Sequence, residues 1–344
     1  MSSHITQAAT PTQQAPEAPT SPLKRMLGGS AGRNLGLFIA FAVLILVGTL
    51  TAGDQFASFD NFVTIIRYAS VLGVMCVGMT FVITAGGIDL SVGSVMGLSS
   101  IVASLTAVQL ASAQTSWLLI VVIALAVGTL AGLVNGVVIA YGKVVAFMAT
   151  LAMLVGARGL AELISNRSTQ IVNNQDFLSF LRADLLGVPI LIWIFVLVAV
   201  AGWILLNRTT FGRRTVAVGG NAEASRLAGI KVQRHMVYVY MISGLTAGIA
   251  AVMMLGRTTV GTSTHGTLYE LDVIAAVVVG GTLLIGGRGT IVGSVLGILL
   301  FSTLINVFTQ NNLSTSVQNV AKGVIIVAAV LLQQRFASRG ARKR

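Results

Sequence analysis

Apolar runs long enough to cross a lipid bilayer follow one another along almost the whole chain. From Asn34 onward, almost every window of about 20 residues is apolar, and an α-helix of that length spans the hydrocarbon core. Hydrophobic residues make up 55% of the sequence and charged residues 9%, and a water-soluble domain could not hide so much apolar surface. The ~10-residue alternating strands of a transmembrane barrel do not occur. The sequence therefore predicts an all-α polytopic membrane protein.

Hydropathy divides this region into ten predicted transmembrane helices. They lie at 35–52, 64–85, 90–110, 117–141, 144–164, 188–206, 236–256, 271–286, 290–309 and 318–334. An even number places both termini on one side. Most of the 22 Lys and Arg residues fall on that side, at Lys24, Arg25, Arg33, Lys143, Arg208, Arg213, Arg214, Arg226, Lys231, Arg234, Arg288, Arg335, Arg339, Arg342, Lys343 and Arg344. Cytoplasmic connections are enriched in basic residues, so the pattern predicts cytoplasmic termini.

The two ends of the chain differ from the spans in composition. Residues 1–33 contain four of the five prolines and a stretch rich in Ser, Thr, Gln and Ala, which is typical of a disordered tail. We expect this cytoplasmic tail to be followed by a transmembrane domain at 34–335 and a basic cytoplasmic tail at 336–344. Because the basic residues flank hydrophobic spans and form no stripe, membrane topology explains the net charge of +12 without a nucleic-acid partner.

An acidic residue interrupts the apolar pattern in the stretch ITAGGIDLSVGSVMG, residues 83–97. Its glycines allow close backbone approach and predict a sharp helix break. Asp89 can accept hydrogen bonds from amides two or three residues on and so cap the next helix. It can also border a polar path across the membrane, and the two interpretations are compatible. The residues predicted for this break and the translocation pathway are Gly86, Gly87, Asp89, Ser91, Gly93 and Asn135.

A second copy of the glycine pattern indicates that part of it is structural. GGIDLSVGSVMG (86–97) and GGRGTIVGSVLG (286–297) share the paired glycines, the Val-Gly-Ser-Val sequence and the final glycine. Gly289 stands where the first copy has Asp89, so the repeat does not preserve the charge. Both copies, and the 128/132/136 glycines of the fourth predicted span, have the Gly-x-x-x-Gly spacing that lets membrane helices pack closely.

The longest basic connection, residues 207–235, contains a short predicted helix. Asn221 is a favourable N-cap, Glu223 lies in the first turn where the helix dipole favours an acid, and Gly229 can end the helix in the left-handed conformation. This pattern predicts a docking element for a soluble partner, and a helix lying on anionic membrane lipid is the alternative. The residues assigned to docking are Asn221, Ala222, Glu223, Ala224, Arg226, Leu227 and Gly229.

Three stretches together resemble the permease subunits of bacterial ABC importers for monosaccharides, the ribose/galactose/xylose-type family. They are GMTFVITAGGIDLSVGSV, TTFGRRTVAVGGNAEASRLAGI and LDVIAAVVVGGTLLIGGRGTIVGSVLGILL, and the similarity runs from about residue 35 to 335. The resemblance implies an ABC importer permease-like bundle of about ten helices in the bacterial inner membrane. One departure is Val145 and Ala146, where members of the family often carry proline.

The same resemblance implies partners. It implies a second permease copy, as a homodimer or a pair of related subunits, and a periplasmic sugar-binding protein that delivers a ribose-like monosaccharide. Separate cytoplasmic ABC ATPase subunits would bind ATP and Mg, so this chain would carry no cofactor. Residues 221–229 would then be the coupling helix that sits in a groove of the ATPase.

The chain lacks the sequence patterns of an enzyme. Gly142 and Lys143 are followed by Val144, without the Ser or Thr and the upstream glycine that a phosphate-binding loop requires. The three histidines, at positions 4, 235 and 265, have no metal-ligand spacing, and no nucleophile and base stand out. We therefore predict no catalytic site and no metal site.

The two longest predicted external connections, 165–186 and 257–272, are expected to receive the binding protein. Glu270 and Asp272 are the predicted contacts, and the alternative is that these acids only stabilise the start of the eighth helix. Arg158 and Glu162, four residues apart on one helix, are expected to form a structural ion pair, and a ligand clamp is the alternative.

Two other classes of transporter remain open from the residues alone. A secondary transporter would use Asp89 as an ion site in a broken helix, and a channel would need no ATP. The capped helix favours the importer, because neither alternative needs a docking element. The scarcity of membrane carboxylates counts against the secondary transporter.

Overall fold

The structure is a computed structural model that describes residues 30–325 and 327, with side chains from Leu37 onward. Its long helices are α2 (Ser30–Ala57), α3 (Phe59–Thr84), α6 (Leu118–Ala140), α7 (Ala146–Ser165), α9 (Ile190–Arg208), α12 (Val232–Thr258) and α14 (Ile291–Gln310). Its shorter helices are α4 (Val92–Ser104), α5 (Thr106–Gln114), α8 (Gln175–Arg182), α10 (Thr210–Gly220), α11 (Ala222–Leu227) and α13 (Tyr269–Val279). Its strands are β1 (Gln170–Ile171), β2 (Asp184–Leu185), β3 (Val188–Pro189) and β4 (Val260–Gly261).

The helices confirm a polytopic all-α membrane protein. Within the described residues, seven helices are long and apolar enough to cross a membrane. The pair α4 and α5, bent by 55°, makes an eighth crossing if it is counted as one span. A total of ten spans is not confirmed.

The eighth predicted span, 271–286, is shorter than a full crossing. Helix α13 has 11 residues, so it rises about 16 Å, roughly half of a ~30 Å hydrocarbon core. It stops because Gly280 and Gly281 follow, and Gly281 has a φ of +92° that no helix continues. The predicted tenth span, 318–334, and the predicted tail 1–33 lie largely outside the described residues, and the tail 336–344 lies wholly outside them.

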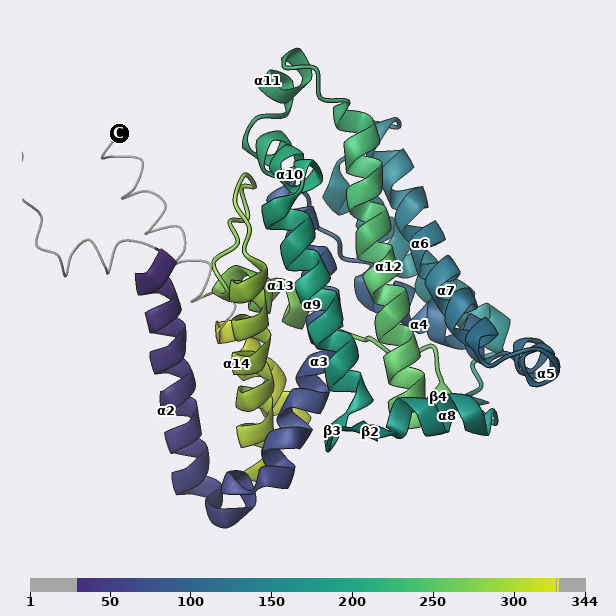
Figure 1. Cartoon of the computed structure of the whole chain (residues 1–344), viewed down its shortest axis with the longest axis vertical. Coiled ribbons are helices and arrows are strands. Elements are labelled where there is room, and N and C mark those ends of the chain that lie inside the picture. Colours follow the sequence, from purple (N-terminus) through teal and green to yellow (C-terminus); the bar gives the residue numbers. More distant parts are fainter. Residues whose placement is uncertain (1–29, 326, 328–344) are drawn as a thin grey trace, which may run out of the picture.

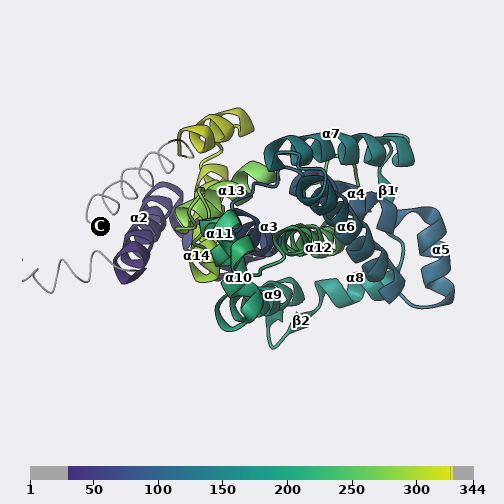
Figure 2. The same ribbon diagram turned by 90° about the horizontal axis from the view of Figure 1, so that it is seen from above.

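Helices α3 and α12 form the centre of the bundle (Figure 2). Both are mostly buried, and α12 packs along α6 and α3. Helix α2 lies at the edge and leaves large apolar side chains such as Phe38 and Leu50 exposed. A helix in contact with lipid requires an apolar exposed face. The exposed apolar side chains of the outer helices therefore account for part of the high hydropathy of the sequence.

The contact between α6 and α12 confirms the close packing predicted from the Gly-x-x-x-Gly spacing. A Cβ added to Gly128 would lie 2.8 Å from the Gly248 amide nitrogen, and one added to Gly136 would lie 2.7 Å from the Val237 Cα. Real Cβ atoms do not approach that closely. The two backbones are therefore in contact because the interface has no side chains at these positions.

The two ends of the bundle differ in structure (Figure 1). Helices α10 and α11 form one end, while α8 and the four short strands lie at the opposite end. Strand β1 pairs with β4, and β2 pairs with β3 through a tight turn. Leu186 and Gly187 form that turn with φ values of +56° and +74°, as a two-residue hairpin of this type requires.

Candidate functional site

The predicted break in the glycine-rich stretch is present. Helix α3 ends at Thr84 and α4 begins at Val92. Gly86 has a φ of +86°, in the left-handed region that favours glycine. The amides of Gly86 and Gly87 bond back to the carbonyls of Ile83 and Val82, at 3.0 and 2.9 Å, and so close the last turn of α3.

Asp89 is buried in this break, with 2% of its surface exposed. Its Oδ1 accepts hydrogen bonds from the Ser91 amide at 2.9 Å and the Ser91 hydroxyl at 2.6 Å. Its Oδ2 accepts a hydrogen bond from the Ser243 hydroxyl of α12 at 2.7 Å. The predicted bond to an amide two residues on is therefore confirmed. Among the described residues, no Lys or Arg forms an ion pair with this carboxylate.

Asn135 joins the same polar cluster from α6. It is buried, and its Nδ2 donates to the Ser91 hydroxyl oxygen at 2.9 Å. The predicted residues Asp89, Ser91 and Asn135 thus meet, and the cluster ties the start of α4 to α6 and α12. Ser243 is the member that sequence reasoning missed, because 154 positions separate it from Asp89 and no spacing pattern links them.

Tyr240 lies beside this cluster. A Cβ on Gly87 would overlap the Tyr240 hydroxyl oxygen, so the close approach of the ring explains why position 87 lacks a side chain. That hydroxyl is buried and, among the described residues, has no hydrogen-bond partner. A buried polar group without a partner is unusual in a native structure.

The second copy of the glycine pattern forms an equivalent break between α13 and α14. Gly286 has a φ of +83°, close to that of Gly86. Thr290 caps α14 by accepting a hydrogen bond from the Gly293 amide at 3.2 Å. A Cβ on Gly289 would overlap the Thr84 hydroxyl oxygen, so the second break has no room for the acid that the first one carries.

Helix α11 has the predicted N- and C-terminal features. The Asn221 side chain accepts from the Ala224 amide at 2.9 Å, and Gly229 follows the helix with a φ of +85°. Arg226 donates to both carboxylate oxygens of Glu223, at 3.1 and 2.6 Å. Leu227 is 75% exposed. The helix projects from its end of the bundle (Figure 1), where it is accessible to a partner.

The exposed Glu223–Arg226 pair is charged at neutral pH. Its hydrogen bonds from Arg226, together with the positive charge, hold the pKa of the Glu223 carboxyl below its usual range. Because the folded pKa is lowered, the stabilisation from this pair is present at neutral pH. It is lost only as the pH falls through that lowered pKa.

A recess of about 540 Å³ adjoins α11. It is lined by Tyr141, Arg226, Gly229, Ile230, Lys231, Gln233 and Arg234. Three of these side chains are cationic and none is acidic; Arg226 is paired with Glu223, and no ion pair of Lys231 or Arg234 is found among the described residues. The recess therefore suits an acidic side chain of a docked protein.

Glu270 and Asp272 lie in the first turn of α13, and both are buried. Asp272 accepts an ion-pair hydrogen bond from Lys322 at 2.8 Å. The Glu270 carboxylate packs against Gly93 of α4, where an added Cβ would lie 2.5 Å from its Oε2. Burial of both carboxylates does not fit direct contact with a binding protein in this conformation.

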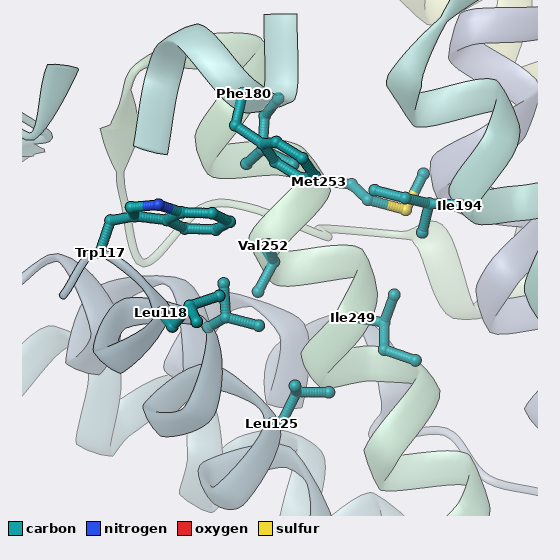
Figure 3. A pocket seen from close by; sticks show the side chains of 10 residues that line it. Trp117, Leu118, Leu125, Phe180, Ile194, Ile249, Val252 and Met253 are labelled. Atoms are coloured by element: carbon teal, nitrogen blue, oxygen red, sulfur yellow. The ribbon is translucent and has the colours of Figure 1, made fainter. Parts of the chain in front are cut away.

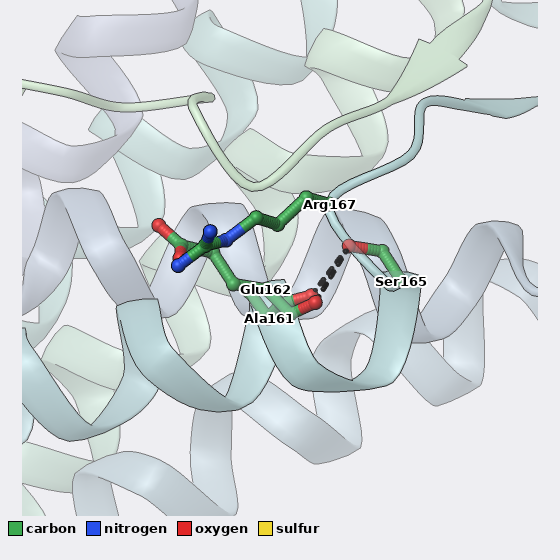
Figure 4. Close-up of polar contacts among 4 residues, drawn as sticks. All are labelled: Ala161, Glu162, Ser165 and Arg167. Atoms are coloured by element: carbon green, nitrogen blue, oxygen red, sulfur yellow. Dashed lines mark hydrogen bonds and ion pairs between the residues drawn. The ribbon is translucent and has the colours of Figure 1, made fainter.

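The predicted ion pair between Arg158 and Glu162 is wrong. Arg158 donates to the backbone carbonyls of Ser263 and His265 in the loop before α13. Glu162 instead pairs with Arg167 at 3.2 Å (Figure 4). The left-handed turn that ends α7 brings Arg167 back over Glu162, and helix spacing alone cannot indicate that turn.

An apolar pocket of about 280 Å³ lies between α6, α8, α9 and α12 (Figure 3). It is lined by Trp117, Leu118, Val121, Leu125, Phe180, Leu181, Ile194, Ile249, Val252 and Met253. A sugar site needs several directional hydrogen bonds, and this lining offers at most the indole N–H of Trp117. Within the described residues, no group of three His, Cys, Asp or Glu side chains could hold a metal ion.

Comparison with known proteins gives consistent matches. Residues 61–330 match the protein family described as "Branched-chain amino acid transport system / permease component". The chain is 40% identical over 298 residues to the ribose import permease protein RbsC of Haemophilus influenzae, covering 86% of this chain and 91% of that protein. It is 38% identical over 314 residues to RbsC of Bacillus subtilis, covering 91% and 96%. It is 38% identical over 307 residues to the L-arabinose transport system permease protein AraH of Escherichia coli, covering 87% and 90%. No solved structure matches the chain.

Proposed function

The chain belongs to the branched-chain amino acid transport system permease component family, and we propose that it forms the membrane pathway for a ribose-like monosaccharide. It is the permease subunit of an ABC monosaccharide importer and a transport component rather than an enzyme. We infer a monosaccharide substrate because the chain is 38–40% identical, over nearly its full length, to ribose and L-arabinose permeases. Both sugars are pentoses, so a pentose is the preferred substrate of this proposal.

Helix α11 is the proposed docking element for a cytoplasmic ABC ATPase subunit, which would bind ATP and Mg. Its support is the capped, projecting geometry, the exposed Leu227 and the adjoining cationic recess. A projecting apolar side chain beside charged groups is typical of an anchor that fills a pocket in a partner. This assignment places α11 and both termini in the cytoplasm, as the distribution of basic residues predicts.

The end opposite α11 is the proposed receiving surface for a periplasmic sugar-binding protein. Because Glu270 and Asp272 are buried, we move the contact to exposed residues of the first outer connection. Asp176 of α8, Asp184 of β2 and Leu186 in the hairpin turn are all exposed there.

The break at 85–91 is proposed to border the pathway beside a second permease copy. Asp89 belongs to a polar cluster and lies between helices of the bundle centre. With only 2% of its surface exposed, it would act on the pathway by shaping the break.

Reconstitution in proteoliposomes tests the function. The permease, its ATPase and its binding protein, supplied with ATP on the ATPase side, are expected to accumulate labelled ribose or arabinose. Uptake should stop when any one component is omitted. Uptake by the permease alone under a proton gradient would contradict the proposal.

Docking is tested separately by co-purification of the ATPase. Glu223→Ala, Arg226→Ala and Leu227→Ala should each weaken association by about tenfold, or ~1.4 kcal/mol. Glu162→Ala breaks an exposed ion pair at the other end of the bundle and is the matched control. Equal association of all four variants would remove α11 as the docking element.

A further inference from the structure

Glycines from three distant parts of the chain meet at the α11 end of the bundle. We call this contact the glycine junction. It consists of Gly86 at the first break, Gly286–Gly287 at the second break, and Gly219–Gly220 at the end of α10. The sequence pattern aligns the two breaks as a repeat but places neither of them beside the end of α10.

The contacts in the junction are between backbones. The Gly287 amide donates to the Thr84 carbonyl at 2.9 Å, which joins the two breaks directly. A Cβ on Gly286 would lie 2.7 Å from the Gly219 carbonyl oxygen and 2.9 Å from the Gly86 Cα. A Cβ on Gly219 would overlap the Thr84 carbonyl oxygen. Side chains are therefore excluded from the centre of the junction.

The junction is connected to the docking helix without a linker. Asn221 follows Gly220 and is the N-cap of α11, while its own amide bonds back to the Ala217 carbonyl of α10 at 3.0 Å. A displacement of α11 must therefore move the end of α10. Side chains can absorb a displacement by changing rotamer, but touching backbones cannot, so the displacement reaches both breaks.

Both breaks lead into the interior of the bundle. Asp89 lies two residues after Gly87 and bonds to Ser243 of α12. After the second break, Ser294 in the first turn of α14 shares a hydrogen bond of 2.7 Å with Thr80 of α3. A shift of the junction therefore acts on the starts of α4 and α14 together.

We propose that the glycine junction is the mechanical link that transmits movement of α11 to both broken spans, with Gly219 as its central positioning residue. This inference rests on the proposed docking role of α11. On a permease whose junction is disturbed, the ATPase should still bind and hydrolyse ATP normally, but transport should fail.

Adjacent glycines provide a matched test. Gly219→Ala forces a methyl group against the Thr84 carbonyl, whereas at Gly220 the nearest atom to an added Cβ is the Gly287 Cα at 4.0 Å. Both substitutions change helix propensity equally. In the reconstituted importer, Gly219→Ala should keep ATPase association and basal hydrolysis and lose at least about tenfold of sugar uptake per ATP hydrolysed, a coupling effect of ~1.4 kcal/mol. Gly220→Ala should behave as wild type. Equal coupling ratios in the two variants would overturn the proposal.

A second variant covers the case in which Gly219→Ala does not fold. One glycine inserted between Gly220 and Asn221 leaves every junction contact intact but loosens its connection to α11. A glycine inserted between Thr115 and Ser116, two exposed residues in the connection of α5 to α6, is the control. The first insertion should keep ATPase association and lose uptake, and the control should keep both. Wild-type uptake, or loss of association, in the first insertion would refute the link. Docking is tested separately by the substitutions at Glu223, Arg226 and Leu227, because those are expected to weaken ATPase association itself.

Discussion

Asp89 is a carboxylate in the interior of an apolar bundle, and three hydrogen bonds explain how it is accommodated there. A buried charge is costly unless its lone pairs are satisfied. The Ser91 amide, the Ser91 hydroxyl and the Ser243 hydroxyl donate these hydrogen bonds. The carboxylate in turn satisfies an amide that would otherwise be free at the start of α4.

Asp89→Asn separates the structural role of this residue from its charge. The amide oxygen can still accept from Ser91, and its NH₂ group can donate to the Ser243 hydroxyl oxygen. We expect a stability loss of about 1 kcal/mol or less and near-normal ATPase association. Uptake should fall by about tenfold if the charge shapes the pathway. Stability is measured by thermal melting in detergent and uptake in proteoliposomes. Wild-type uptake by Asp89→Asn would show that Asp89 only stabilises the start of α4.

Tyr240→Phe tests the unpartnered hydroxyl beside Gly87. Since the described residues offer that hydroxyl no hydrogen bond, its removal should leave melting unchanged or raise stability by up to about 1 kcal/mol. Ser243→Ala is the contrasting variant, because it removes a bond to a carboxylate and should cost about 1.5 kcal/mol or more. Strong destabilisation by Tyr240→Phe would show that the hydroxyl has a partner, such as a buried water.

At the scale of elements, helices are joined mainly where glycine spacing lets backbones touch. The contact of α6 with α12 and the junction of the two breaks with α10 both follow this rule. Helix α13 shows the opposite effect of glycine, because Gly280 and Gly281 end it after half a crossing.

Gly132→Ala compares two opposing effects on stability: overpacking of the α6–α12 contact, which destabilises, and the higher helix propensity of alanine, which stabilises. Its methyl group would overlap the Tyr240 carbonyl oxygen, and overpacking of this kind costs about 1–3 kcal/mol. Gly156→Ala in α7 is the control, since no atom lies within 4 Å of an added Cβ there. Alanine should leave α7 unchanged or stabilise it by up to about 1 kcal/mol. Melting temperatures in detergent decide between the two effects, and equal shifts would contradict the close contact.

At the scale of the whole molecule, the two ends of the bundle are distinct in charge and shape. The α11 end has a projecting helix and a cationic recess, while the opposite end has the short strands and α8 (Figure 1). Between them, buried polar groups connect helices that are far apart in the chain. Lys322 and Asp272 are one example, since they tie helical residues 315–325 to α13.

The Lys322–Asp272 pair predicts a non-additive response to mutation. Side-chain exposure is 18% for Lys322 and 5% for Asp272, so removal of one partner leaves the other charge poorly solvated. Lys322→Met alone should destabilise by about 3 kcal/mol, and Asp272→Asn alone by somewhat less because Lys322 is the more exposed partner. The double variant should recover most of the loss. Thermal melting of all four proteins measures the coupling, and additive effects would contradict the pair.

Local pattern was sufficient to predict the membrane class, the break in the glycine-rich stretch, the capped helix α11 and close packing at the glycines of α6. Each depends on residues within a few turns of one another. Hydropathy windows, N-cap chemistry and glycine spacing are local signals, so a linear reading can recover them. The cap at Asn221 and the left-handed Gly229 lie where the sequence predicts them.

The remaining features required the folded chain, because they join residues that are distant in sequence. The Ser243 partner of Asp89 and the burial of Glu270 belong to this group. The glycine junction does too. Hydropathy predicts that a segment is apolar but cannot indicate whether packing lets it cross fully. A glycine shows that close approach is possible, and only the fold determines which backbone approaches it.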